Sequence, residues 1–325
     1  MRPIYTLLLV TLFVAHVGAA QSTPDTNAPA PAPGAENLAS TIGPTAFVQI
    51  AGNSSSMGAV ASYTFDLGYN LTSKIGADIG VPLYTTRTPF PLTTTSDWRY
   101  TTILGAPYID LRYTTQRSGL NITSILTASI GYNSVKIYSC GRVVADFYNH
   151  IDHTYDVLNL ATFTPFINFG EATGTMDRAV MPSPYNVARP YETLGYIASG
   201  EAGGNFGFRK HYKLGGSIYG LAPQGPQKVF SRLVSPDSLL ASYPTHNRFW
   251  DAYFETGGEY VDTYGAGPSR ISRDNGYSAW LEVTRFKNLS IEVAYTRSVH
   301  YAYDSAFIMI RYDFTKLLRN LTIGE

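Results

Sequence analysis

Two short segments of the chain hold side chains that could do chemistry. In the first, His150, Asp152 and His153 fall within four consecutive positions. Imidazole and carboxylate groups are suitable ligands for several divalent metals. On an extended strand, however, His150 and His153 would face opposite sides, and we expect a turn here. We therefore interpret the segment as a solvent-exposed turn and predict neither a metal site nor a cofactor.

In the second segment, Ser298 and His300 are two positions apart and would share one face of a strand. A nucleophilic serine needs a base within hydrogen-bond reach and a third group that orients the base. The segment lacks the Gly-x-Ser-x-Gly sequence that places such a serine on a sharp turn. We therefore predict no catalytic residues, and the chain is not expected to be an enzyme.

Strands are the elements that would position these residues, because apolar and polar residues alternate along much of the chain. In one segment Ala61, Tyr63 and Phe65 alternate with Ser62 and Thr64. Successive side chains on a strand point to opposite faces, so such a segment has one apolar and one polar face. The 25 tyrosines, the 29 glycines and the low share of charged residues, 15%, favour strands and turns. The sequence predicts an all-β protein.

Strand length helps to choose between two all-β architectures. A soluble β-sandwich turns the apolar faces of its strands inward, whereas a membrane barrel turns them outward to lipid. The predicted strands are roughly 9 to 18 residues long, which suits tilted membrane strands better than sandwich strands. Tyr and Phe recur near the strand ends, as an aromatic girdle requires. We predict an antiparallel transmembrane β-barrel.

The connections predict an even number of strands, about 12. The predicted strands span residues 44–52, 57–71, 74–86, 98–115, 119–134, 140–152, 157–171, 191–208, 211–223, 275–286, 288–299 and 304–315. Every second connection is short, while the others include long ones such as 224–274. An even number leaves both termini on the periplasmic side, with short turns there and long loops outside. Ten or fourteen strands would also satisfy this pattern, because residues 249–254 could supply part of another pair.

Residues 1–20 have the three parts of a signal peptide: a basic start, an apolar core and a small-residue exit. We expect cleavage after Ala20; the alternative, a membrane-anchoring helix, fits the short apolar run less well. Residues 21–43 are rich in Pro and Ala and should form a flexible segment. The barrel would cover residues 44–315, followed by a C-terminal extension, 316–325. With 24 basic and 24 acidic residues, the chain has no charge excess that would indicate a nucleic-acid partner.

Isolated charges on the polar strand faces are the candidate site residues, because these faces would line the barrel interior. They are Asp66, Asp78, Asp110, Arg112, Arg142, Asp146, Glu201, Glu282, Glu292, Arg311 and Asp313. A charge in the interior avoids the cost of facing lipid, and rings of such charges can select ions or polar solutes. The alternative is a network of ion pairs that braces a narrow, closed barrel. The mixture of acidic and basic groups leaves both interpretations open.

The alternating hairpins behind a signal peptide and a Pro/Ala-rich segment resemble transporter-like outer-membrane barrels of Gram-negative bacteria. The resemblance covers roughly residues 44–315 and includes Asn275-Gly276 leading into Trp280, and the segment from Tyr295 to Ser298. The strand ending on Phe314 is similar to the assembly signal of such proteins, although 11 further residues follow it. The resemblance implies contact with outer-membrane lipid and with the barrel-assembly machinery, and it implies no substrate.

Three functions are compatible with such a barrel. The leading hypothesis is a passive channel or transport-type protein for small polar solutes. The second is a structural or adhesive surface protein with a closed interior that acts through the long loop 224–274. The third, an outer-membrane hydrolase, is the least favoured, because the chain lacks the His-x-Ser-Asn-Gly pattern of the outer-membrane phospholipase family.

Overall fold

The computed structural model describes residues 42–55, 58–88, 99–130, 143–157, 161–174, 191–209, 211–231, 263–265, 273–286, 288–300 and 303–323. The predicted signal peptide lies outside these residues, as does nearly all of the predicted flexible segment. Arg142 and most of the loop 224–274 also lie outside the described residues.

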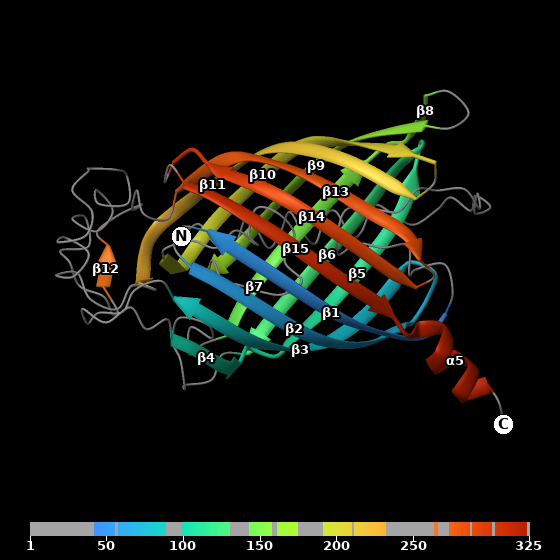
Figure 1. Cartoon of the computed structure of the whole chain (residues 1–325), viewed down its shortest axis with the longest axis horizontal. Coiled ribbons are helices and arrows are strands. Elements are labelled where there is room, and N and C mark those ends of the chain that lie inside the picture. Colours follow the sequence, from blue (N-terminus) through green and yellow to red (C-terminus); the bar gives the residue numbers. More distant parts are fainter. Residues whose placement is uncertain are drawn as a thin grey trace, which may run out of the picture.

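In this part of the chain, twelve antiparallel strands form a closed barrel. In ring order they are β1 (Gly43–Ser55), β2 (Gly58–Asn70), β3 (Ile75–Thr88), β5 (Tyr108–Arg117), β6 (Leu120–Ile130), β7 (Val143–Asp152), β9 (Ala161–Gly174), β10 (Tyr191–Phe208), β11 (Tyr212–Ser231), β13 (Asp274–Phe286), β14 (Leu289–Ser298) and β15 (Tyr303–Asp313). The ring closes where β15 pairs with β1. The strands are steeply tilted, and each lies beside its neighbours in the sequence (Figure 1).

The predicted strand count of twelve is confirmed, with one change in how a strand is built. The predicted strand 98–115 is divided into β4 (Arg99–Leu104) and β5, and both pair with β3. The break falls at Gly105–Pro107, where Pro107 has no N–H to donate to a neighbouring strand. Two further short strands extend the ring: β8 (Tyr155–Asp156) pairs with β9, and β12 (Thr263–Gly265) pairs with β11.

Short turns connect strand pairs at one end of the barrel, as predicted. Between β5 and β6 the turn consists of Ser118 and Gly119, whose φ angles are 54° and 82°. A type I′ turn requires a positive φ at both central residues, and its twist matches that of the strands it joins. Gly119 is suited to this backbone because it has no Cβ.

A helix that the sequence did not predict, α5 (Thr315–Ile323), lies at the same end and covers most of the predicted C-terminal extension. The Asp313 carboxylate accepts a hydrogen bond from the Thr315 N–H at 2.7 Å and so caps the helix. Arg319 donates from Nε to the carbonyl of Pro44 at 3.0 Å, which ties the helix to β1. Among the residues described here, no helix is long and apolar enough to span a membrane.

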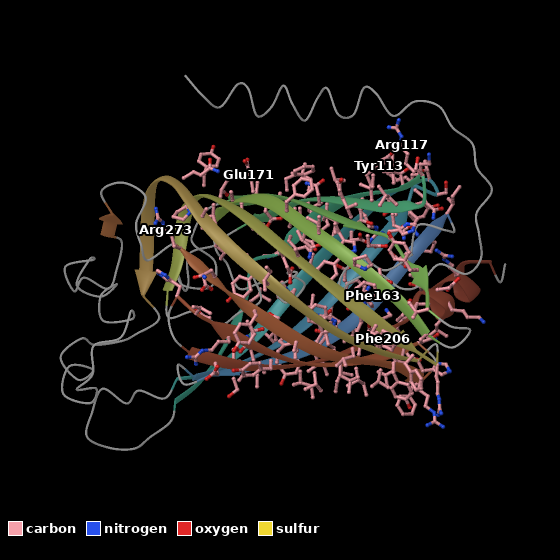
Figure 2. The ribbon with its side chains drawn as sticks, turned by 90° about the horizontal axis from the view of Figure 1, so that it is seen from above. Tyr113, Arg117, Phe163, Glu171, Phe206 and Arg273 are labelled. Atoms are coloured by element: carbon pink, nitrogen blue, oxygen red, sulfur yellow. The ribbon has the colours of Figure 1, made fainter. Side chains whose placement is uncertain are left out.

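The barrel has its apolar side outside and its polar side inside. Large apolar side chains on the outward face are freely exposed, for example Leu67 at 64% and Ile218 at 68%. On the same strands, the alternate residues Asp66 and Ser217 face inward and are buried. Figure 2 shows side chains projecting outward along the barrel, with Tyr113, Phe163 and Phe206 toward the end at which α5 lies. The soluble sandwich is therefore excluded as the fold.

Candidate functional site: the polar barrel interior

The interior is lined by the inward-facing side chains of all parts of the ring, and most of these side chains are polar. Of the predicted site residues, the structure buries Asp66, Asp78, Arg112, Asp146, Glu201, Glu282, Glu292 and Arg311. Asp110 and Asp313 are half-buried. Asp313 caps helix α5, whereas Arg142 lies outside the described residues.

Strands β2, β3 and β5 bring one cluster of predicted charges together. The Arg112 guanidinium forms an ion pair with Asp78 at 3.0 Å and also donates to the side-chain oxygen of Asn70 at 3.1 Å. Asp66 accepts a hydrogen bond from the Tyr108 hydroxyl at 2.9 Å. Both Arg112 and Tyr108 reach from β5 over β3 to β2. These bonds therefore link β5 to β2, which are separated by β3 in the ring. The cluster lies along the wall of the barrel.

A second group forms a continuous hydrogen-bonded belt across five consecutive strands. The belt runs through Asn121 (β6), Asp152 and His150 (β7), Asn168 (β9), Glu201 (β10) and Ser217 (β11). Glu201 receives two hydrogen bonds from uncharged groups, at 2.7 Å from the Asn168 amide and at 2.5 Å from the Ser217 hydroxyl. Sequence reasoning identified only Glu201 among these six.

His150 lies in the middle of this belt, which corrects the interpretation of its segment as a solvated turn. Its side chain is 1% exposed and belongs to strand β7. The Asn168 amide donates to Glu201, so the Asn168 oxygen faces His150 Nδ1 at 2.6 Å, while His150 Nε2 faces Asp152 at 2.9 Å. Both ring nitrogens therefore lie beside side-chain oxygens of neighbouring residues in the belt. His153 instead lies beyond the strand, with Nδ1 2.6 Å from the carbonyl of Gly119.

A third group lies on β11, β13 and β14. Lys213 forms an ion pair with Glu282 at 3.0 Å. Glu292 is directly opposite Glu282 in the β13–β14 register and is 3% exposed. Like charges opposite one another on neighbouring strands repel. Glu282 and Glu292 are therefore neighbours beside a single lysine, so acidic side chains outnumber basic ones in this group.

Ser298, considered above as a nucleophile, donates its hydroxyl proton to Asp274 at 2.7 Å. Asp274 also accepts a hydrogen bond from the Tyr219 hydroxyl at 3.2 Å. A hydroxyl has one proton, and that of Ser298 goes to a carboxylate. His300 lies in the turn that follows β14. In the described part of the chain, no group of three or more His, Cys, Asp or Glu side chains could hold a metal ion.

Large inward side chains lie against the wall, over glycines of neighbouring strands. A Cβ added to Gly215 would lie 2.2 Å from the Trp280 ring, and one added to Gly80 would lie 2.0 Å from the Tyr108 ring. Trp280 Nε1 also donates to Asn205 at 2.9 Å, across the intervening strand β11. The Arg311 guanidinium lies 3.8 Å from the centre of the Phe47 ring on the adjacent strand, within the range of a cation–π contact.

Several interior residues were missed by sequence reasoning, namely Tyr108, His150, Asp152, Lys213, Ser217 and Asp274. The signal that could have found Tyr108 and Lys213 is strand parity: Tyr108 is two residues before Asp110, and Lys213 is two residues before the inward Gly215. His150 and Asp152 lie within the predicted strand 140–152, but their segment was interpreted as a turn, and the chain leaves the strand only after Asp152.

No protein-family model matches the sequence, and no curated protein matches it significantly. Solved structures with a similar fold include an outer membrane channel from Pseudomonas putida F1, with 9% identity and a TM-score of 0.48, covering 84% of this chain and 96% of that chain. The NanC porin has 7% identity and a TM-score of 0.40, with coverages of 82% and 98%. The transport unit of the autotransporter AIDA-I from Escherichia coli has 11% identity and a TM-score of 0.41, with coverages of 96% and 99%. These likenesses concern the course of the chain alone.

Proposed function

We propose that the chain is an outer-membrane β-barrel that works as a passive channel for small polar solutes. The membrane part of the proposal is supported by the outward face. Exposed aromatic side chains form two bands: Tyr69, Phe163, Phe206, Phe286 and Tyr312 near the end with α5, and Tyr196, Tyr277 and Tyr295 toward the other end. Between the bands lie exposed aliphatic residues such as Ile79, Leu126 and Ile167. Aromatic girdles of this kind lie at the two interfaces of a membrane.

The distance between the two bands agrees with a membrane. Tyr277 and Phe286 belong to opposite bands and are nine residues apart on β13. Nine residues span about 30 Å along a strand, and a tilt of about 40° reduces this to a height of about 23 Å. The apolar band of outer-membrane barrels is about 25 Å tall.

The channel part of the proposal rests on one observation: the large and charged interior side chains are bonded along the wall. The hydrogen bonds described above join strands that are adjacent or separated by one strand in the ring. Bonds of this kind hold the side chains against the wall from which they project. A network that closed the barrel would instead link opposite walls. Many interior side chains are buried by their neighbours. We therefore expect the passage to be narrow and to admit only ions and small polar solutes.

Single-channel recording in planar lipid bilayers tests the proposal on the purified full chain. We expect discrete current steps from protein that is folded, as judged by its β-type circular dichroism and by a heat-dependent shift in gel mobility. If folded protein gives no current steps, the channel proposal is wrong and the alternative of a closed surface barrel is favoured.

A matched pair of cysteine variants then locates the passage, in a Cys140→Ser background. Thr127 faces inward on β6 and the neighbouring Leu126 faces outward. A charged, water-soluble thiol reagent should reduce the current through Thr127→Cys and leave Leu126→Cys unchanged, because the second thiol faces lipid. Equal responses of the two variants would contradict a passage through the interior.

A further inference from the structure

The buried charge of the interior is strongly biased toward acid, although the chain as a whole is neutral. Among the described residues, the buried carboxylates are Asp66, Asp78, Asp146, Asp152, Glu201, Asp274, Glu282 and Glu292, and the buried guanidinium groups are Arg112 and Arg311. Other arginines, such as Arg117, Arg209 and Arg285, are exposed near the strand ends. The imbalance therefore comes from where the charges are placed.

The interior cations do not neutralise this surplus. Arg112 is paired with Asp78 and Lys213 with Glu282. His150 Nε2 lies 2.9 Å from Asp152. Arg311 lies over the Phe47 ring and also interacts electrostatically with Asp66. Among the described residues, the eight buried carboxylates outnumber these basic side chains.

Two of the buried carboxylates accept hydrogen bonds from uncharged donors. Glu201 is bonded to an amide and a hydroxyl, and Asp274 to two hydroxyls. Hydrogen bonds from neutral groups stabilise a carboxylate but leave its negative charge in place. The two residues lie on β10 and β13, so the negative charge is spread around the wall.

Some buried carboxyl oxygens have no hydrogen-bond partner among the described residues. Asp66 Oδ1 and Glu292 Oε2 are examples, and each of these two residues is 3% exposed. Both face the interior, from β2 and from β14 respectively. A buried carboxylate oxygen with no donor is costly, and a cation that passes or binds beside it would remove that cost.

We propose that the barrel interior selects small cations over anions. The proposal rests on the channel function proposed above and adds its substrate class. A low-dielectric wall that carries one sign of charge raises the local concentration of counter-ions, and rings of Asp and Glu are the devices by which cation channels select. Asp66 and Glu292 are the positions at which this structure offers an unshared oxygen to the passing ion.

The test is the reversal potential of the full chain in planar bilayers, with KCl at different concentrations on the two sides. We expect a permeability ratio of K⁺ to Cl⁻ above one. The ratio should fall toward one in Asp66→Asn and Glu292→Gln, and further in the double variant, since each substitution replaces one carboxyl group by an amide at nearly constant volume. Gel mobility before and after heating shows whether each variant is folded.

Glu171→Gln is the control, because Glu171 is an exposed residue of the outward face of β9 (Figure 2). The substitution makes the same chemical change, carboxyl group to amide, outside the barrel interior. Its permeability ratio should equal that of the unmodified chain. A ratio of one or below in the unmodified chain overturns cation selectivity while the channel function stands, and so does a ratio that stays unchanged in the folded double variant. Folded protein without any current overturns the channel function together with this inference.

Discussion

Trp280 occupies the space above Gly215 on the inner wall of the barrel. The two residues are directly opposite one another in the β11–β13 register. The Trp280 indole lies over the glycine and donates its Nε1 proton to Asn205 on β10. A side chain at position 215 would therefore force the indole away from its hydrogen bond.

We expect Gly215→Ala to destabilise the barrel by about 1–3 kcal/mol, the usual cost of overpacking. The free energy of unfolding can be measured by urea titration of the protein in lipid vesicles. Gly220→Ala on the same strand is the control, because a Cβ there meets nothing within 4 Å. Similar losses in the two variants would show that the contact with Trp280 does not matter.

Removing Arg112 should be costly because its ion pair with Asp78 is buried, with side-chain exposures of 7% and 6%. We expect Arg112→Met to lose about 3–5 kcal/mol of unfolding free energy, since it leaves a buried carboxylate without its partner. Adding Asp78→Asn to this variant should restore part of the loss. Asp304→Asn serves for comparison: it breaks an exposed ion pair with Arg297, which should cost no more than about 1 kcal/mol. If Arg112→Met and Asp304→Asn lost the same unfolding free energy, the burial of the Arg112–Asp78 pair would not account for its contribution.

The lipid-facing assignment predicts a depth-dependent penalty for charge. Ile79 is on the outward face, 57% exposed, and lies between the two aromatic bands. Ile79→Arg should cost about 2–4 kcal/mol in lipid vesicles, because the midplane of a membrane does not solvate a guanidinium. Leu71 is also exposed but lies in the turn after β2, so Leu71→Arg should cost about 0–1 kcal/mol. If unfolding titrations gave the same small cost for both variants, the outward face would not lie in lipid.

The helix α5 should depend on its cap. Asp313→Ala removes the acceptor for the Thr315 N–H, whereas Asp313→Asn keeps an oxygen in the same place. We expect the alanine variant to lower the local stability of the helix by about 0.5–2 kcal/mol. Hydrogen exchange of the α5 amides measures this directly, and exchange should be faster in the alanine variant only. Equal protection in all three proteins would exclude the capping role.

The all-β class, the strand count and the outward apolar face could be predicted from the sequence because they follow from a two-residue period. That period is local, and each strand shows it without reference to the others. The split of one strand at Pro107 could also have been anticipated, because a proline cannot donate to a sheet. Helix α5 was missed because the sequence after Phe314 is short and contacts a strand more than 250 residues away.

The candidate site was predicted only at the level of which residues face inward. The pairing of Arg112 with Asp78, or of Glu201 with Asn168 and Ser217, depends on register between strands, which alternation does not specify. His150 was misassigned because its segment was interpreted as a solvated turn, although it lies within the predicted strand 140–152, which ends where β7 ends. A histidine and an asparagine on neighbouring strands carry no sequence signal that they will meet.

The seam between β1 and β15 has a consequence for how the chain reaches its final form. Asn53 and Ser305 are hydrogen-bonded across this seam although 252 positions separate them. In every other pair of neighbouring ring strands, the second strand follows the first along the chain with at most one short strand between them. Until the C-terminal strand has been synthesised and docked, the sheet is an open ribbon whose first strand offers free N–H and C=O groups to any other extended chain. The ring therefore cannot close before β15 has been synthesised, and a truncation that removes β15 would leave an unpaired edge that can pair with a second molecule.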